Sequence, residues 1–343
     1  MRKQLRFSNG ATTVLYFASA FKHLNSIVAK KSAVIITDEH VFALHQPKFK
    51  GYHCIVLKSG EVFKTQQTVD SVIQQLITIQ ADKTYTLVGV GGGVVTDITG
   101  YVASIYMRGI AFGFVPTTLL AMVDASIGGK NGVDVGHYKN MIGTTRQPHF
   151  ILYDTTFLKT LPQAEWFNGF AEIIKHAAIK DAAMFKQLQQ YDIAYYQKHR
   201  THLQLLIQRN ALLKGKVVVN DPFEQGDRKL LNFGHTLGHA LENQYQISHG
   251  EAISVGMCFA VYASQCYANF KQADAVVALL SQYQLPTQLS FDPKSAFEIL
   301  KMDKKRASSD MRYILLQRIG KAYIQTIPLK DIVGLLYSYK QFN

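Results

Sequence analysis

Three histidines in residues 232–251, NFGHTLGHALENQYQISHGE, have the side-chain type and spacing to hold a metal ion. His235 and His239 are four residues apart, so on a helix both imidazoles project from one face. Ser248 and Glu251 have the spacing of a capping box, which places His249 in the first turn of a second helix. This corner predicts a metal site, although two histidines at helical spacing are more often simply packed and hydrogen-bonded. The H-x-x-x-H pattern lacks the glutamate of the H-E-x-x-H motif, so a metalloprotease is disfavoured.

Gly234 and Gly238 share the four-residue spacing of the histidines. Inside a helix each glycine costs roughly 1 kcal/mol relative to alanine. The pair therefore indicates the close approach of a ligand or of another backbone.

A second candidate lies in the helical pattern of residues 169–179, GFAEIIKHAAI, where Glu172 and His176 are four residues apart and Lys175 lies beside them. A glutamate between apolar residues needs a partner if it is buried. Metal ligation would satisfy it, and an ion pair with a nearby lysine is the alternative.

A glycine turn, Gly91–Gly93, follows a strand predicted at residues 84–90 and precedes the helical pattern VVTDITGYVASIYM. Three glycines would let the backbone approach a pyrophosphate, and the helix start would supply amide donors. The pattern is G-G-G-x-x-x-D and not G-x-G-x-x-G, so a merely tight turn is an equal alternative. Asp38, at the end of an earlier strand, could hydrogen-bond ribose hydroxyls, which favours a dinucleotide.

Residues 1–155 alternate β-rich runs with helical patterns, which indicates a parallel α/β sheet. Strands are predicted at 33–37 and 54–57, and a crossover helix at 69–79. From residue 156 the pattern is helical, with segments at 169–179, 181–200 and 201–219, and residues 337–343 read as a polar tail. We therefore expect an α/β, Rossmann-like domain at 1–155 and an all-α domain at 156–343.

The segment from Phe112 to Gly143 contains Asp124, Lys130, Lys139 and Asn140 among glycines, after a Pro116-Thr117-Thr118 helix cap. Loops with lysines among glycines suit anion binding, and an exposed loop is the alternative.

The composition favours an enzyme of anionic metabolites. The 343 residues include 48% hydrophobic residues and carry a formal net charge of +13. The basic residues are dispersed except at 301–306, whereas nucleic-acid binders concentrate them in a stripe, so phosphate- or carboxylate-bearing metabolites are favoured. No apolar run suits a membrane span or signal peptide, and the three cysteines form no C-x-x-C pair, which predicts a cytoplasmic protein.

Taken together, the motifs GGGVVTD, DASIGGKNG, GHYKNMIG, FLKTLP, AEIIKH, NFGHTLGHA and HGEAISVGM resemble those of the 3-dehydroquinate synthase family, in the same order and over about residues 38–306. The resemblance implies an N-terminal NAD-binding domain, a C-terminal helical domain with a divalent metal, zinc or cobalt, and a homodimer. By resemblance the metal ligands would be Glu172, His235 and His249, and His239 would face the substrate.

The resemblance also implies two further sets of residues. The NAD-binding positions would be Asp38, Ser59, Gly60, Glu61, Val62, Phe63, Lys64, Gly91, Gly92, Gly93, Val94, Val95, Thr96, Asp97, Thr117, Thr118, Lys130, Lys139, Phe157, Leu158, Lys159 and Thr160. The substrate pocket would contain Asp124, Lys130, Asn140, Lys175, Lys214, Arg228, Asn232, His239 and Lys304.

The implied substrate, 3-deoxy-D-arabino-heptulosonate 7-phosphate, carries a phosphate and a carboxylate, which accounts for the basic residues. In the implied reaction, NAD transiently oxidises a ring hydroxyl, phosphate is eliminated, hydride returns, and an aldol closure gives 3-dehydroquinate. The metal would act as a Lewis acid. The substrate phosphate is a reasonable base for the elimination, with His239 or a lysine-held water assisting later proton transfers.

Two positions depart from the family pattern. Thr96 replaces a glycine before Asp97, and Asp221-Pro222-Phe223-Glu224 replaces a more acidic segment. Related cyclases that make 2-deoxy-scyllo-inosose or valiolone rings, and glycerol-dehydrogenase-type metal enzymes, are the rival functions. Arg228 with Lys130 and Asn140 favours the dehydroquinate enzyme.

Overall fold

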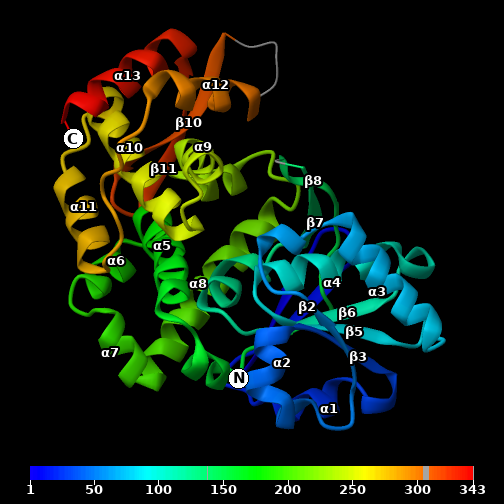
Figure 1. The fold of residues 1–343 in the computed structure, drawn as a ribbon. Helices are drawn as coiled ribbons and strands as arrows, with labels where there is room; N and C mark the ends of the chain where they lie inside the picture. Colours follow the sequence, from blue (N-terminus) through cyan, green and yellow to red (C-terminus); the bar gives the residue numbers. More distant parts are fainter. Residues whose placement is uncertain (137, 304–308, 343) are drawn as a thin grey trace. The chain divides into compact units, whose positions relative to one another are not determined.

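The computed structural model describes residues 1–136, 138–303 and 309–342 (Figure 1). Its contacts divide the chain into two compact units, residues 1–166 with 200–223, and residues 167–199 with 224–343. We call these unit 1 and unit 2. Among the described residues, no helix is both long and apolar enough to cross a membrane.

Unit 1 is built on a seven-stranded sheet with the strand order β1-β2-β9-β6-β5-β3-β4. All neighbouring strands pair in parallel except β1 and β2. The strands are β1 (Arg2–Arg6), β2 (Thr12–Tyr16), β3 (Ala33–Asp38), β4 (His53–Leu57), β5 (Thr86–Gly91), β6 (Ala111–Pro116) and β9 (Phe150–Leu152). This confirms the predicted parallel sheet and the three strands predicted within it.

Helices cover both faces of this sheet. In Figure 1, α3 and α4 lie on one face and α1 and α2 on the other. The helices of unit 1 are α1 (Leu24–Ile27), α2 (Glu39–His45), α3 (Gln66–Thr78), α4 (Gly93–Ile105) and α8 (Arg200–Asn220). The face toward α1 and α2 has an aromatic core in which Phe21, Phe49 and Phe157 are buried. The crossover helix predicted at 69–79 is α3.

A separate hairpin, β7 (Lys130–Val135) and β8 (Tyr138–Thr145), replaces the loop that the glycines of this segment suggested. The glycines serve the pairing of its strands: a Cβ on Gly132 would lie 2.4 Å from the Ile142 carbonyl oxygen. Glycine lets the two backbones approach closely without interrupting the strands.

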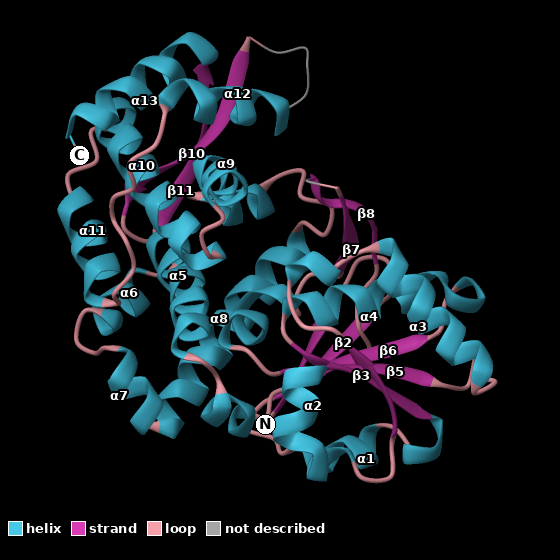
Figure 2. Cartoon of the chain, viewed as in Figure 1, coloured by secondary structure: helices cyan, strands magenta, loops and turns pink. Residues whose placement is uncertain are grey.

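Unit 2 is mainly helical, as Figure 2 shows. The helices are α5 (Gln163–Lys180), α6 (Ala182–Leu188), α7 (Ile193–Lys198), α9 (His235–Tyr245), α10 (His249–Ala268), α11 (Ala273–Gln282), α12 (Pro293–Asp303) and α13 (Leu329–Phe342). Helix α10 lies at the centre, in contact with α9, α11 and β10, and most of its side chains are buried.

Three expectations for this half of the chain need correction. The helical domain also contains an antiparallel pair, β10 (Asp310–Arg318) and β11 (Lys321–Pro328). Residues 337–342 are the end of α13 and not a tail, because Ile332, Leu336 and Tyr339 form a buried apolar stripe. The predicted helix at 181–200 is two short helices, capped by Asp181 and Asp192.

The contacts of α8 also differ from the expected domain division. This helix follows the predicted boundary at residue 156, yet it packs with unit 1, where a Cβ on Gly215 would lie 2.9 Å from Leu5. The assignment of whole functions to residues 1–155 and 156–343 stays a prediction.

Candidate active site

Helices α5, α9 and α10 bring Glu172, His235 and His249 together in unit 2. Glu172 is completely buried, and its Oε1 lies 3.3 Å from Nε2 of His235 and 3.3 Å from Nε2 of His249. One potential ligand atom from each residue lies within 4.8 Å of those of the other two. Residues 77 positions apart along the chain thus converge on one point, as a three-ligand metal site requires.

Among the described residues, the partners that stabilise the charge on Glu172 are side chains. Lys175, which follows Glu172 on α5, forms an ion pair with its other carboxylate oxygen. Burial by itself would raise the pKa of the Glu172 carboxyl, but Lys175 and the two imidazoles hold that pKa well below its usual value. The carboxylate is therefore ionised at neutral pH, the form in which it can ligate a metal.

The two imidazoles differ in protonation. Burial, together with Lys175, lowers the pKa of His235, whose Nδ1 lies 3.2 Å from the Phe233 carbonyl oxygen. Burial would also lower the pKa of His249, but hydrogen bonds to Glu172 and Glu242 raise it to about 9. The shared Glu172 oxygen is thus faced by one ring whose pKa is lowered and one whose pKa is raised.

The predicted capping box positions His249. The Ser248 side chain accepts from the backbone N–H of Glu251, and the Glu251 carboxylate accepts from the Ser248 N–H at 2.9 Å. The backbone N–H of Gly250 donates to the Asn168 side chain at 2.8 Å. These bonds fix the start of α10, where the imidazole of His249 emerges.

The glycines of this corner allow α9 and α10 to pack backbone to backbone. Gly234 has φ +79° and precedes α9, and so the helical cost expected for it does not apply. Gly238 lies inside α9, where a Cβ would be 3.0 Å from the Ala252 carbonyl oxygen. Gly256 is tighter still, since a Cβ there would lie 1.9 Å from the Gly234 carbonyl oxygen. The close approach predicted from the glycine spacing is therefore that of another helix.

His239 lies beside the three-residue cluster without belonging to it. Its ring centroid is 5.1 Å from that of His235 and 6.4 Å from that of His249. With Glu242 and His249, His239 forms a second group whose potential ligand atoms lie within 4.8 Å of one another. Glu242 was missed in the sequence, although its position three residues after His239 on α9 could have indicated it.

Unit 2 also contains three other residues predicted for the substrate pocket, Lys175, Arg228 and Asn232. Lys175 is 2% exposed, and Arg228 is 3% exposed. The side-chain amide of Asn232 donates to the carboxylate of Glu224. Glu224 is the last residue of the segment 221–224, which departs from the family pattern. Lys304 lies outside the described residues.

In unit 1 the predicted cofactor residues follow the carboxyl ends of adjacent parallel strands. Asp38 ends β3, Ser59 follows β4, Gly91 ends β5, and Thr117 follows β6. Ser59 donates to Asp38 at 3.2 Å, and the Thr117 N–H donates to the Gly91 carbonyl at 3.0 Å. The carboxyl edge of a parallel sheet is where such folds bind nucleotides.

The glycine turn leads directly into α4, whose start has no side-chain cap. Gly91 is required for packing, because a Cβ there would lie 2.5 Å from Val95. A Cβ on Gly93 would make only an ordinary contact, at 3.5 Å from Ala125. Thr96, the departure from the family pattern, is buried, and its hydroxyl donates to the Gly93 carbonyl at 2.9 Å. The first amides of α4 therefore remain available to an anion.

Lys64 connects two predicted residues of unit 1. Its Nζ lies 2.6 Å from Asp97 Oδ2 and 2.6 Å from the side-chain oxygen of Asn140. Burial raises the pKa of Asp97 despite Lys64 and Lys214. Asp134, which sequence reasoning missed, accepts from the Asn140 backbone N–H at 2.7 Å, where Asn140 has φ +55°.

Lys214, on α8, lies 2.8 Å from the Asp124 carboxylate and donates to the Asp124 carbonyl oxygen at 2.8 Å. Lys130 and Lys139 lie on β7 and β8. The family resemblance implies a substrate or cofactor role for Asp124, Lys130, Lys139 and Lys214, and the structure joins Asp124 and Lys214 within unit 1.

The remaining predicted cofactor residues differ in how much of their surface is exposed to solvent. The Val62 side chain is 79% exposed, whereas Phe157 and Leu158 are 1% and 3% exposed. The segment Thr155–Thr160 is a short helical turn capped by Asp154. Glu61–Phe63 are thus accessible to a ligand, whereas Phe157 and Leu158 expose almost no surface.

The comparison with protein families covers most of the chain. Residues 54–168 match the 3-dehydroquinate synthase N-terminal family model, and residues 169–306 match the C-terminal one. The chain is 42% identical to 3-dehydroquinate synthase of Pyrococcus abyssi over 284 residues, 82% of this chain and 84% of the relative.

Two solved structures show the same fold over the whole chain. A 2-deoxy-scyllo-inosose synthase complexed with carbaglucose-6-phosphate, NAD+ and Co2+ is 25% identical, with a TM-score of 0.86 and coverage of 98% of this chain and 100% of that one. The 2-epi-5-epi-valiolone synthase of Streptomyces hygroscopicus subsp. jinggangensis 5008, with NAD+ and Zn2+ bound, is 25% identical, with a TM-score of 0.87 and coverage of 99% and 98%. With both of its halves matched and a relative this similar, the chain belongs to the 3-dehydroquinate synthase family.

Proposed function

We propose that this chain is an NAD- and divalent-metal-dependent lyase that converts 3-deoxy-D-arabino-heptulosonate 7-phosphate to 3-dehydroquinate and phosphate. The observation that carries the proposal is the convergence of Glu172, His235 and His249 on one point. Family membership supports the reaction, and the bound NAD+, Co2+ and Zn2+ of the two similar cyclases support the cofactors.

The donor set fits a catalytic divalent metal. Two imidazoles and one carboxylate are the ligands of a zinc site that keeps a position open for substrate. Glu172 is ionised and completely buried, and among the described residues its carboxylate forms ion pairs with Lys175 and the two imidazoles. We assign Glu172, His235 and His249 as the ligands. The bound NAD would supply hydride transfer, and the metal would supply polarisation of the alcohol oxygen.

We assign NAD binding to the carboxyl edge of the unit 1 sheet. The uncapped amides at the start of α4 suit a pyrophosphate, and the Asp38 carboxylate at the end of β3 suits ribose hydroxyls. Gly91 keeps α4 close to the sheet, so these donors are held by backbone geometry.

Substrate binding is assigned to the cations of the predicted pocket. Lys175 and Arg228 are buried in unit 2, where they would neutralise a substrate that carries both phosphate and carboxylate. In the proposed mechanism the substrate's own phosphate accepts the proton lost in the elimination. His239, next to the proposed ligands, would carry protons in the later reduction, ring opening and aldol closure.

The direct test is turnover by the purified full-length chain. We expect release of phosphate and formation of dehydroquinate from the heptulosonate phosphate with zinc and a catalytic amount of NAD, without accumulation of NADH. Stoichiometric NADH would indicate a metal-dependent alcohol dehydrogenase instead. Turnover of glucose 6-phosphate in place of the heptulosonate would indicate a cyclase of the 2-deoxy-scyllo-inosose type.

A further inference from the structure

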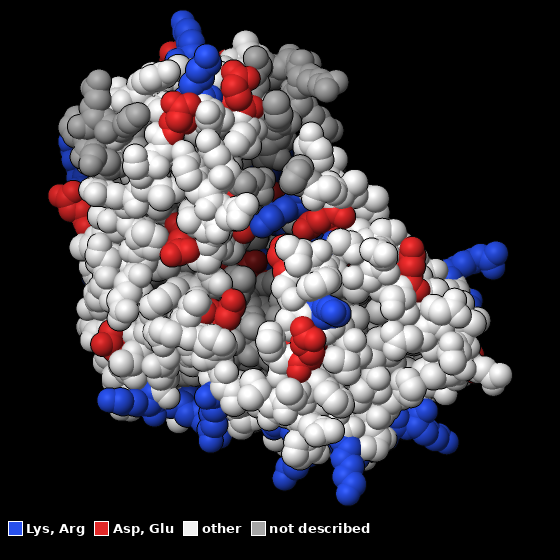
Figure 3. Space-filling view, viewed as in Figure 1, with Lys and Arg blue, Asp and Glu red and all other residues white. Residues whose placement is uncertain are grey.

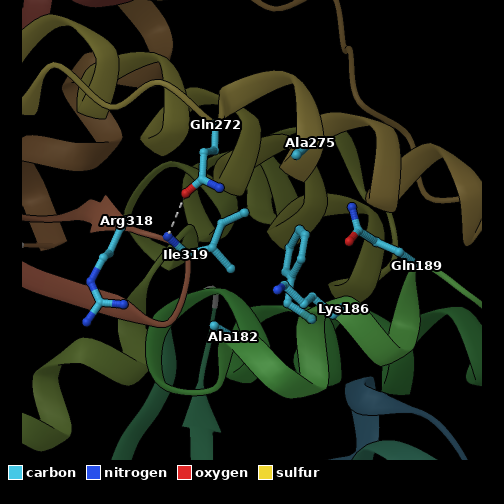
Figure 4. Close-up of a pocket in the computed structure, with 8 residues that line it drawn as sticks. Ala182, Lys186, Gln189, Gln272, Ala275, Arg318 and Ile319 are labelled. Carbon is cyan, nitrogen blue, oxygen red and sulfur yellow. Dashed lines mark hydrogen bonds between the residues drawn. The ribbon is translucent and has the colours of Figure 1, made fainter.

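A small pocket of unit 2 contains none of the residues assigned to the reaction. It lies between α6, the start of α11 and the turn between β10 and β11, and its volume is about 260 Å³ (Figure 4). Its lining residues are Ala182, Phe185, Lys186, Gln189, Gln272, Ala275, Arg318 and Ile319.

The walls of this pocket are anchored. The backbone N–H of Gly320, in the β10–β11 turn, donates to the Ala178 carbonyl at 2.8 Å. Gly320 has φ +82°, and a Cβ there would lie 2.7 Å from the Ala182 nitrogen, so the turn seats directly against α6. The side chain of Gln282, on α11, donates to the Tyr191 carbonyl at 2.7 Å, beyond the end of α6. Contacts within the chain therefore hold the three walls of the pocket in place.

Part of the lining is apolar. Phe185 is 1% exposed and Ile319 is 9% exposed, and Ala182 and Ala275 present only methyl groups. A cavity of roughly 150 Å³ lined by apolar side chains is enough to hold a benzene ring. The volume here leaves room for one ring and a small polar substituent.

The polar lining is made of cations and amides. Figure 4 shows Arg318 and Gln272 on one side, and Lys186 and Gln189 on the other. Among the described residues, neither Lys186 nor Arg318 has an ion-pair or hydrogen-bond partner, and no carboxylate lines the pocket. Gln272 Oε1 accepts from the Ile319 N–H at 3.4 Å, which leaves its NH2 group to donate elsewhere.

We propose that this pocket binds a small carboxylate with a planar, apolar body, such as an aromatic monocarboxylate. The ring would lie against Ile319 and the methyl groups of Ala182 and Ala275, above the buried Phe185, and the carboxylate would accept from Arg318 or Lys186 and from a glutamine amide. None of the residues assigned to the reaction lines this pocket, so the proposed ligand would be distinct from the substrate and from NAD. An inorganic phosphate would match the cations but leave the apolar wall without a partner.

Isothermal titration of the full-length chain, loaded with NAD and zinc, tests this proposal with benzoate, benzamide and inorganic phosphate as probes. Benzoate should bind, and the double variant K186Q/R318Q should weaken its binding at least tenfold. The variant A275L, which fills the pocket without changing its charge, should weaken it similarly. K321Q removes a lysine from the start of β11, outside the lining, and should leave the affinity unchanged.

The other outcomes overturn the proposal. Failure of benzoate to bind the unsubstituted protein shows that the pocket is not a carboxylate site. If benzamide binds as tightly as benzoate, the cations do not contribute to binding. If phosphate binds more tightly than benzoate, the apolar wall does not contribute. Benzoate binding that survives both K186Q/R318Q and A275L lies elsewhere on the molecule. A thermal unfolding curve for each variant confirms that a lost affinity is not a loss of folding.

Discussion

Asp154 in unit 1 and Glu172 in unit 2 are both carboxylates whose side chains are completely buried. Asp154 accepts from the backbone N–H groups of Phe21 and Thr156, each at 2.9 Å, and from the Thr156 hydroxyl. Glu172 is faced by Lys175 and two imidazoles, all of them side chains. In both, the pKa is lowered although burial alone would raise it.

The partners of the two carboxylates, backbone donors at Asp154 and side chains at Glu172, distinguish a structural carboxylate from one that can bind a metal. Backbone donors cannot leave Asp154 unless Thr155–Thr160 or the segment at Phe21 moves, so its hydrogen bonds stabilise the fold. Side chains can rotate away from Glu172, and a metal can replace the proton that they share with it. A low pKa alone therefore does not identify a catalytic residue.

The substitution Glu172→Gln should have the largest effect on activity. It removes the only carboxylate proposed as a metal ligand. Because a metal stabilises the transition state by several kcal/mol, its loss should lower kcat/KM about 10³-fold or more. Zinc content, measured by atomic absorption after dialysis, should fall in parallel. Glu165→Gln, two turns earlier on α5, should retain both metal and activity. Full zinc content in Glu172→Gln would contradict the ligand assignment.

His239→Ala should come next, with kcat reduced about 10²–10⁴-fold because a proton carrier is lost. Zinc content should remain that of the unsubstituted protein. Loss of zinc in this variant, and also in Glu242→Gln, would instead assign the metal to the group His239, Glu242 and His249.

Asp154→Asn should affect stability and not chemistry. Hydrogen bonds to a charged group contribute about 1.5–3 kcal/mol, so the free energy of unfolding in urea should fall by about 1–3 kcal/mol at pH 7. Because the folded pKa of Asp154 lies below the unfolded value of about 3.9, this contribution is present above that pH and is lost as the pH falls through the folded pKa. The difference in the free energy of unfolding between the unsubstituted protein and Asp154→Asn should therefore become smaller at acid pH.

Asp82→Asn is the matched control for that measurement. Asp82 accepts from the Thr84 N–H and hydroxyl in the same local pattern, but it is exposed to solvent. Its substitution should change stability much less than Asp154→Asn. Equal effects would show that burial does not distinguish the Asp154 carboxylate.

Lys48→Gln should have the smallest effect. Lys48 lies 3.2 Å from Asp154, but its side chain is 30% exposed, and a partly exposed ion pair contributes about 1 kcal/mol or less. The urea midpoint should shift only slightly. A shift as large as that of Asp154→Asn would mean that the lysine, and not the backbone, stabilises the buried carboxylate.

The sequence predicts that the basic residues are dispersed except at residues 301–306. On the face drawn in Figure 3, several lysine and arginine side chains gather along the lower edge, and the others stand apart, so that no basic stripe crosses the face. The formal net charge of +13 is a property of the whole chain, and this face carries acidic as well as basic side chains.

Local patterns predicted the elements whose signals are contained in a few neighbouring residues. The strand at 33–37, the crossover helix at 69–79 and the capping box at Ser248 and Glu251 were all predicted correctly. The β7–β8 and β10–β11 hairpins were missed, because their pairing depends on contacts between strands and their glycines resemble loop residues.

The sequence by itself determined the strand and helix periodicity, the capping of α10, and, through its motifs, membership of a family. The family motifs also named His235 and His249 as the partners of Glu172, a choice that helical spacing left open. Only the tertiary structure decided that these side chains meet, which glycines serve helix packing, and that α8 packs with unit 1. Helical spacing specifies the face on which a side chain projects, but a metal site needs donors from separate helices at one point. That convergence is set by the packing of α5, α9 and α10, which no single segment encodes.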